Sequence, residues 1–326
     1  MSAEPGEGRF DVVVLGDLFC DLATMPIAGY PERDRQLGCQ FQLTIGGQAG
    51  NCAAACASLG LKTALISKLG HDVLSHWVRS ELENLGVTVF ASVTEKAELQ
   101  HPGITVSITF IDGSRSMLSD RGANSELMEA DVNLEFLEKA RFVMRAGHWN
   151  TEGLFAANRK ILETAQAAGA QTGVDIGWSA YLGWTGHARS SVLELLPATE
   201  FLFLNAAELE GLSGKQGMKG ARELLARGCK HVILHQGAQG SSWVTRDFEI
   251  RSSAFPVEPI NPTGVGDVFN ASFICAILAG KDPDACLRFA NACAATYIST
   301  KRRGNVFPAP RDVARFLDQP AREEDR

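Results

Sequence analysis

The sequence lacks the features that mark membrane and secreted proteins. No apolar stretch approaches the roughly 18 residues needed to cross a bilayer, and the most apolar one, around Ala271 to Ala279, is half as long. The opening residues, MSAEPGEGR, carry two glutamates and no apolar segment, so they do not resemble a secretory signal. We therefore expect a cytoplasmic protein with no membrane partner.

Positive charge is also scarce. The 326 residues contain 31 Lys and Arg against 38 Asp and Glu, a net charge of -7. Such a chain has no general attraction for a phosphate backbone or an anionic membrane, so we predict that nucleic acid is not a partner. Hydrophobic residues make up 45% and charged residues 21%, as in ordinary folded globular proteins.

Cysteine is present, but not in a pattern that suggests disulfides or zinc. There are eight cysteines and no CxxC pair, in a chain too long to need covalent stapling. Cys52 and Cys56 are four residues apart on a predicted helix and could share a metal, yet no histidine lies near them. We expect most of the cysteines to be buried thiols.

Short apolar runs alternate with amphipathic stretches along the chain. The runs have the length of buried parallel strands, and they lie at Phe10 to Gly16, Lys62 to Lys68, Arg141 to Ala146, Gln171 to Asp175, Glu200 to Leu204 and His231 to His235. Helices are predicted between them, at Gln48 to Leu59, Val73 to Leu85, Glu152 to Ala168, His187 to Leu196 and Met218 to Arg227. This order predicts an α/β fold, a three-layer, doubly wound and mostly parallel sheet in a single domain over residues 1–326.

Two stretches alternate apolar and polar residues with period two. They are Cys39 to Ile45 and Ile104 to Phe110, the second followed by an Asp112-Gly113 hairpin turn and a further strand at Ser114 to Leu118. Such strands do not fit a sheet buried on both faces. We predict a small β-sheet lid built from insertions at about 36–46 and 102–120. Its apolar face needs a cover, either the substrate or a second subunit, and we expect a homodimer through the lid.

The stretch NPTGVGD, ending at Asp267, is the first candidate for chemistry. Gly264 and Gly266 flank Val265 at the start of an apolar helix, where exposed backbone N–H groups and the helix dipole favour an anion such as a phosphoryl group. Asp267 lies in the first helical turn, where a carboxylate is also favourable for purely structural reasons. The GxG does not extend to GxGxxG, and the chain has no GxxxxGK[ST], so Rossmann and Walker sites are excluded.

A second glycine-rich stretch, IGGQAGN, joins a predicted lid strand to an alanine-rich helix. Gly46, Gly47 and Gly50 allow a ligand to approach closely, and Asn51 offers both a donor and an acceptor to hydroxyl groups. Tight packing of the helix would explain the alanines but not three glycines together with an asparagine.

These stretches resemble the PfkB-type carbohydrate kinases, the ribokinase-like family. GGQAGN is similar to the family's N-terminal signature and NPTGVGD to its C-terminal one; NAAE at Asn205 to Glu208 is similar to its NxxE element. HQGAQG at His235 to Gly240 resembles the glycine-bearing strand end that borders the nucleotide. The four elements occur in the family's order over nearly the whole chain. The resemblance implies a ribokinase-like fold and ATP-dependent phosphorylation of a hydroxymethyl group on a sugar or sugar-like molecule.

The resemblance also implies roles for individual residues. Asp267 matches the catalytic base, and the N–H groups of Gly264, Val265 and Gly266 match the anion hole. Glu208 matches the element that organises Mg²⁺, through water, and Asn205 accompanies it on the nucleotide side; an exposed helix charge is the alternative for Glu208.

Substrate and nucleotide contacts are implied in the same way. Asp21, Gly47 and Asn51 match sugar contacts, and Asp17 could do the same work or serve only the structure. The implied nucleotide contacts are Gly237, Gly240 and Asn291, although Asn291 could equally be an exposed polar residue on its helix.

The chain departs from the family pattern at several positions. Asn261 replaces the Asp that helps to surround a monovalent cation, which makes K⁺ activation doubtful. After Asp175 the chain lacks the Asn and Arg of some fructokinase-like members, so a typical fructokinase or ketodeoxygluconate kinase is less expected. Arg115 and Arg121 could meet an anionic substrate group or form salt bridges.

Two alternatives to a sugar kinase remain open. Trp149, Trp178 and Trp184 could stack on a purine or simply be buried, which keeps a nucleoside kinase open. The other alternative is a non-catalytic regulator that senses a sugar or nucleotide.

Overall fold

The computed structural model describes residues 9–112, 114–177, 183–184, 186–260, 262–301 and 304–318. At its centre lies a nine-stranded sheet with the order β13-β12-β11-β10-β9-β8-β1-β4-β5. Its strands are β1 (Phe10–Leu15), β4 (Thr63–Leu69), β5 (Thr88–Val93), β8 (Ala140–Arg145), β9 (Gln171–Asp175), β10 (Phe201–Asn205), β11 (His231–His235), β12 (Ser241–Val244) and β13 (Glu249–Ser252). Neighbouring strands pair in parallel, except that β12 is antiparallel to both β11 and β13.

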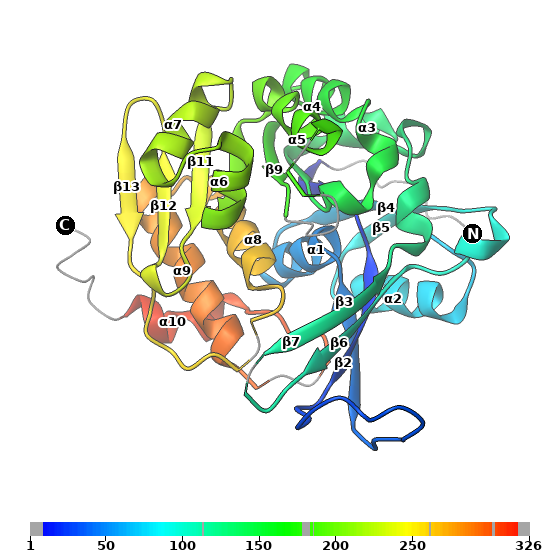
Figure 1. Cartoon of the computed structure of the whole chain (residues 1–326). Coiled ribbons are helices and arrows are strands. Elements are labelled where there is room, and N and C mark those ends of the chain that lie inside the picture. The colour runs from blue at the N-terminus through cyan, green and yellow to red at the C-terminus, as the bar shows by residue number, and fades with distance from the viewer. Residues whose placement is uncertain are drawn as a thin grey trace.

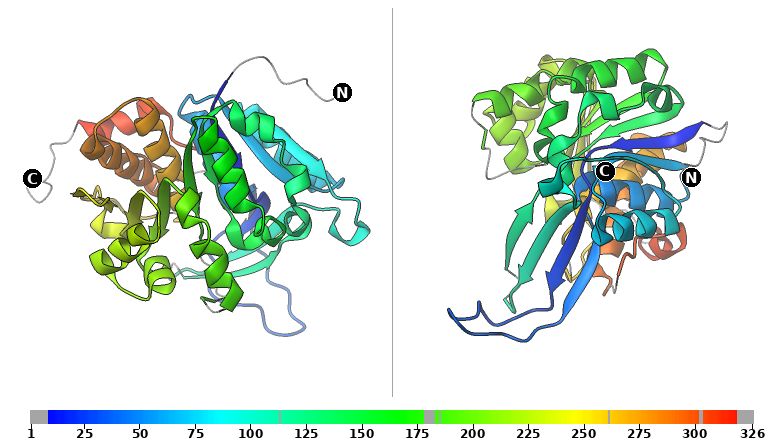
Figure 2. Two further views of the ribbon diagram at one scale, coloured as in Figure 1. Left: turned by 90° about the horizontal axis from the view of Figure 1, so that it is seen from above. Right: turned by 90° about the vertical axis from the view of Figure 1, so that its right-hand side faces the viewer.

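Helices cover both faces of this sheet (Figures 1 and 2). One face carries α1 (Gln48–Ser58), α2 (Val73–Asn84), α8 (Val265–Leu278), α9 (Pro283–Ser299) and α10 (Pro310–Leu317). The other carries α3 (Leu134–Glu138), α4 (Asn158–Ala167), α5 (Gly186–Leu193), α6 (Ala206–Ser213) and α7 (Gly217–Ala226). Along β1, Val12 and Val14 belong to one apolar cluster and Val13 and Leu15 to another, so both faces of the strand are buried. This explains the unbroken apolar runs, and the predicted three-layer fold is confirmed.

A second sheet projects from the first as a lid. It has the order β3-β2-β6-β7, with strands β2 (Phe19–Thr24), β3 (Phe41–Gly46), β6 (Gly103–Thr109) and β7 (Arg115–Asp120). β2 pairs in parallel with β6, while β3 and β7 are antiparallel to their neighbours. The sequence indicated β3, β6 and β7 but not β2, because FCDLAT does not alternate cleanly. β2 is the centre of the lid and connects it directly to β1.

The lid strands alternate apolar and polar residues as predicted. The face that the lid turns toward the core carries polar residues. Asp21 pairs with Thr105, and Thr105 with Ser119, so their side chains share one face of the lid. Leu22 pairs with Leu43 and with Val106, on the opposite face. The substrate was one of the two covers predicted for the apolar face of the lid. That prediction is wrong, because the face that lines the cavity carries Asp21, Thr105 and Ser119.

Some local predictions were also wrong. The helix expected from Glu152 begins only at Asn158, because Glu152–Leu154 forms a 3₁₀ turn in which Gly153 packs directly on Leu127 and Met128.

All eight cysteines are free thiols and six of them are buried, as expected. In the part of the chain that the structure describes, no helix has the length and apolar character needed to cross a membrane.

Candidate active site

A cavity of about 230 Å³ lies between the lid and the edge of the central sheet where β1 ends. On the core side it is lined by Asp17, Gln48, Asn51, Asn150, Gly264 and Asp267. On the lid side it is lined by Phe19, Asp21, Thr105, Ser107, Met117 and Ser119. The lining therefore combines the two glycine-rich stretches with residues of three lid strands.

The turn before α8 needs glycine at the N-cap position of the helix. Gly264 is the N-cap of α8 and has φ of 78°, in the left-handed region. A Cβ atom at this residue would lie 3.0 Å from the Tyr297 hydroxyl and 3.2 Å from Asn51 Nδ2. The first N–H groups of a helix have no partner within the helix, although that of Val265 makes a long 3.4 Å bond to Pro262 O. The turn thus has the backbone donors that an anion hole requires.

Asp267 lies in the first turn of α8 and is held from α1. Its Oδ2 accepts a hydrogen bond from Asn51 Nδ2 at 2.9 Å, and its side chain is buried. Burial raises the pKa of Asp267 well above its ordinary value, and the charge of Asp175 adds to this effect. Asp267 therefore binds a proton more tightly than an ordinary aspartate, and it faces the cavity.

Asp17 follows β1 and has both carboxylate oxygens occupied. Oδ1 accepts from the backbone N–H of Ala49 at 3.0 Å, and Oδ2 accepts from Asn150 Nδ2 at 2.8 Å. Burial raises its pKa, although these hydrogen bonds and the charge of Arg145 oppose the shift. Asp17 thus fixes the start of α1. Asn150 was missed, because nothing in the sequence marks it.

Asp21 stands on the lid strand β2 and faces the cavity from the other side. Its carboxylate is hydrogen-bonded to the Thr105 hydroxyl, and Thr105 Oγ1 lies 3.1 Å from Ser119 Oγ. Burial, followed by the charge of Asp17, raises the pKa of Asp21 to about 7. At the turn into α1, Gly47 has φ of 81°, and a Cβ there would lie 2.8 Å from Asp17 O.

Glu208 caps the helix that follows β10. Its Oε2 accepts from Asn205 N at 2.7 Å, and Asn205 Oδ1 accepts in return from Glu208 N at 3.0 Å. Glu208 is 6% exposed, so it is not a solvated surface charge. Burial and then the charge of Asp175 raise its pKa to about 7. No group of three metal-ligating side chains occurs among the described residues.

Two of the implied nucleotide residues meet at the end of β13. Gly240 has φ of 98°, and a Cβ there would overlap the carbonyl of Ser252. Asn291 is buried and donates from Nδ2 to Ser252 O at 3.0 Å and to Ser253 O at 3.3 Å. Gly237 has φ of 58° and open space around it. Asn291 is thus a link between α9 and β13 and not an exposed helix residue.

Comparison with known proteins identifies the family of the chain. The family model described as pfkB family carbohydrate kinase matches residues 10–310. The chain belongs to this family. Its relatives include the ribokinase of Bacillus subtilis, 28% identical with 94% of this chain and 99% of that protein covered, and the deoxyribokinase of Salmonella typhi, 24% identical with 94% and 98% covered.

Solved structures share the fold of this pfkB-family chain. The structure of Arabidopsis thaliana ribokinase complexed with ribose and ATP has a TM-score of 0.79 and 25% identity, with 96% of this chain and 100% of that chain covered. A putative ribokinase II from E. coli in complex with ATP and Mg²⁺ has a TM-score of 0.83 and 20% identity, with 94% and 99% covered.

A hydrogen-bonded chain that the sequence did not indicate lies behind the start of α8 in this pfkB-family protein. Asn270 donates from Nδ2 to Asp175 Oδ2 at 2.6 Å, and its Oδ1 lies 2.8 Å from His235 Nε2. Because the amide nitrogen faces the carboxylate, the amide oxygen must accept, and His235 carries its proton on Nε2. Asn270 is one turn beyond Asp267, so these hydrogen bonds fix the N-terminal end of α8 to β9 and β11.

The other candidates do not line the cavity or lie outside the described residues, although Arg115 contacts Thr263 at its edge. Arg115 of the lid donates to the Thr263 hydroxyl, and Arg121 forms a 3.0 Å ion pair with Glu152. Trp149 and Trp184 pack edge to face with centroids 5.6 Å apart in a separate aromatic cluster. Asn261 and Trp178, on which expectations for K⁺ and for a purine depended, lie outside the described residues.

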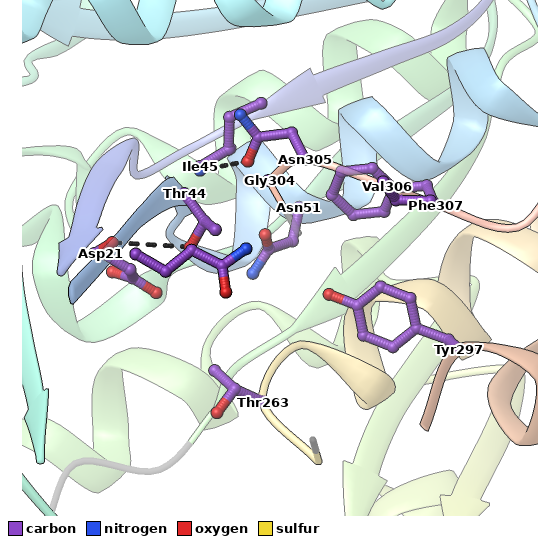
Figure 3. A pocket seen from close by; sticks show the side chains of 11 residues that line it. Asp21, Thr44, Ile45, Asn51, Thr263, Tyr297, Gly304, Asn305, Val306 and Phe307 are labelled. Carbon is purple, nitrogen blue, oxygen red and sulfur yellow. Dashed lines mark hydrogen bonds between the residues drawn. The ribbon is translucent and has the colours of Figure 1, made fainter. Parts of the chain in front are cut away.

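A smaller pocket behind Asn51 joins the site to the C-terminal segment (Figure 3). Asn305 closes it, since its Oδ1 accepts from Ile45 N at 2.7 Å and its Nδ2 donates to Glu81 at 2.7 Å. Tyr297 turns its hydroxyl into the same space as Asn51. Asn305, which follows α9, thus supports the lid strand β3, while Tyr297 of α9 lies beside Asn51.

Proposed function

We propose that this pfkB-family protein transfers the γ-phosphoryl group of ATP to a hydroxymethyl group of a sugar or sugar-like molecule. The observation that carries the proposal is the Asn51–Asp267 hydrogen bond. It places a carboxylate of raised pKa beside the exposed N–H groups of α8 and across the cavity from Asp21. Phosphoryl transfer needs this combination of an aligned hydroxyl, a base and charge stabilisation.

Each residue then has a defined task. Asp21 accepts hydrogen bonds from hydroxyls of the acceptor, and Asn51 and Gly47 complete the acceptor site from the core. Asp267 takes the proton of the attacking hydroxyl. The N–H groups of Gly264, Val265 and Gly266 bind the oxygens of the transferred group. Asp17 positions the start of α1, because its Oδ1 accepts from the N–H of Ala49, and its carboxylate can accept further hydrogen bonds from the acceptor.

The nucleotide is proposed to bind along the ends of β10, β11 and β13. Asn205, Gly237, Gly240 and Asn291 would border it, with Asn291 acting through the backbone of Ser252. Mg²⁺, when bound with ATP, neutralises charge on the phosphates. Glu208 fits a water-mediated role toward it, since one carboxylate oxygen already caps Asn205 and Mg²⁺ keeps much of its hydration.

The test is a screen for ADP release with pentoses, hexoses, polyols, sugar acids and nucleosides as acceptors. Asp267→Asn protein serves as the control for background ATP hydrolysis. We expect one or more sugars or polyols to support turnover. Turnover with nucleosides alone would instead favour the nucleoside kinase, and tight binding of one ligand without any turnover would favour the regulator.

We further propose that two copies associate through the exposed outer face of the lid. Leu22, Leu43 and Val106 are half-buried on this face, and Leu118, which pairs with Val106, is 68% exposed. A contiguous apolar surface of this kind marks an interaction site. Light scattering should give a dimer mass, and Leu118→Glu should shift it toward the monomer. A monomer at every concentration, with and without sugar, would contradict this arrangement.

A further inference from the structure

The charges around the acceptor cavity are of one sign. Three carboxylates line it, Asp17 and Asp267 from the core and Asp21 from the lid. The described residues of its lining include no lysine, arginine or histidine. The side chains that hydrogen-bond to Asp17 and Asp267 are amides, those of Asn150 and Asn51, while the charge of Arg145 acts on Asp17 from behind the cavity.

Basic side chains near this region are engaged elsewhere. Arg145 is completely buried behind Asp17, and its guanidinium donates to Asn158, to the Thr151 hydroxyl and to the carbonyl of Ala146. Arg115 reaches Thr263, two residues before Val265, at the end of the cavity where phosphoryl transfer is proposed. Neither lines the space enclosed by Asp21, Thr105 and Asn150.

Hydroxyl groups form the rest of the polar lining on the lid. Asp21, Thr105 and Ser119 stand in register across three neighbouring strands, and Ser107 lies two residues along β6 on the same face. A serine or threonine hydroxyl both donates and accepts, and a carboxylate accepts, so this row matches the hydroxyls of a polyol. It offers no fixed positive donor to an acidic group.

We propose that the acceptor site selects uncharged polyhydroxylated molecules and rejects sugar acids and phosphorylated sugars. The inference rests on the proposed kinase function and narrows its substrate class. An acceptor carboxylate would enter a partly desolvated space lined by three carboxyl groups, and none of the described lining residues is a cation that could pair with it. The row formed by Asp21, Thr105 and Ser119 supplies the recognition, and the surplus negative charge supplies the rejection.

The experiment compares acceptors that differ in charge but little in shape. Each neutral aldose or polyol is paired with its aldonate, for example ribose with ribonate and glucitol with gluconate. kcat/KM is measured by ADP release and Kd by calorimetry for both members of each pair. For the best neutral acceptor we expect kcat/KM at least about 100-fold above that of its aldonate, which corresponds to about 2.7 kcal/mol.

Two variants test the cause of the discrimination. At pH 8, above the pKa of about 7 of Asp21, Asp21→Asn removes one negative charge from the cavity and keeps its shape, so the ratio of kcat/KM for the neutral acceptor to that for the anionic acceptor should fall at least about tenfold. Asp120→Asn is the matched control, because Asp120 lies on the same lid but is 66% exposed in its side chain, and it should leave the ratio unchanged.

The outcomes separate this inference from the kinase proposal. If no acceptor is phosphorylated but neutral sugars bind at least tenfold more tightly than their aldonates, the kinase function fails and the selectivity stands. If an aldonate or a sugar phosphate is the best acceptor, or the two members of the best pair differ less than tenfold, the selectivity is overturned and the kinase function stands. Failure of every neutral sugar and polyol to bind overturns the selectivity as well.

Discussion

Asn51 and Asp267 stand 216 positions apart in the chain and are joined by a hydrogen bond of 2.9 Å. The contact unites the two glycine-rich stretches, one at the start of α1 and the other at the start of α8. Asn51 Nδ2 and the Tyr297 hydroxyl also leave no room for a side chain on Gly264. The proposed base and the proposed anion hole are thereby held in one arrangement, from which the first prediction follows.

Asp267→Asn should lower kcat by about 10²- to 10⁴-fold, because the amide keeps the size of the carboxylate but cannot accept the proton. The Kd for the acceptor should change much less. Rapid-quench kinetics should first establish that chemistry limits both rates. A variant that then retains a tenth or more of wild-type kcat would show that another group is the base.

Gly264→Ala should reduce both kcat and stability, since alanine is strained at φ of 78° and its Cβ would press on Tyr297 and Asn51. Gly280→Ala is a matched control at the other end of α8, where φ is 72° and nothing lies within 4 Å of a Cβ. The control should lose stability only, about 1 kcal/mol in urea unfolding. Equal kcat values for the two variants would argue against a tightly built turn.

Asp21→Ala should raise the KM for the sugar about ten- to a hundredfold, since it leaves hydroxyls without a partner at a cost of roughly 1 to 3 kcal/mol. The KM for ATP should move little, because Asp21 is on the lid and the proposed nucleotide residues are at the ends of β10, β11 and β13. Loss of ATP affinity with sugar affinity kept would reverse the orientation of the site.

The stability of the protein should depend on pH through Asp21. Its folded pKa is about 7 against an ordinary value of 3.8, so the folded state binds the proton more tightly than the unfolded state. The contribution of Asp21 to stability is then greatest below about pH 4, declines as pH rises to about 7 and is level above that. In urea unfolding at pH 5 to 8, Asp21→Asn should show a smaller decline than wild type. If the free energy of unfolding fell equally with pH in wild type and in Asp21→Asn, the result would contradict the raised pKa of Asp21.

Asn270→Ala should destabilise the fold by about 1 to 3 kcal/mol, because it removes the hydrogen-bond partner of Asp175 Oδ2 and of His235 Nε2, although Asp175 Oδ1 still accepts from Gly177 N. It should also lower kcat, since Asn270 fixes the helix turn that follows Asp267. Asn84→Ala, at the exposed end of α2, should cost less than about 0.5 kcal/mol and leave kcat unchanged. If Asn270→Ala unfolded at the same urea concentration as wild type, these hydrogen bonds would not have the stabilising role proposed for them.

The layers of the fold could be predicted from the sequence because buried parallel strands need continuous apolar runs. β1, β8 and β11 have such runs, whereas β2 combines Asp21 with apolar neighbours and was missed. β2 forms a strand because it pairs on both edges, with β3 and with β6. Such pairing cannot be predicted from a local sequence pattern. The same holds for Asn150 and Asn270, whose roles depend on distant carboxylates that only the folded chain brings near.

The position of Thr105, Ser107 and Ser119 on the lid hairpin separates two proposed tasks, part of the recognition of the acceptor on the lid and phosphoryl transfer on the central layers. The groups proposed to choose the acceptor belong to strands that can be lengthened, exchanged or mutated, while Asp267 and the turn at Gly264 stay on the central layers. Acceptor range can therefore drift during evolution at little risk to the phosphoryl-transfer chemistry. A family with this arrangement can acquire new substrates through substitutions in one small sheet.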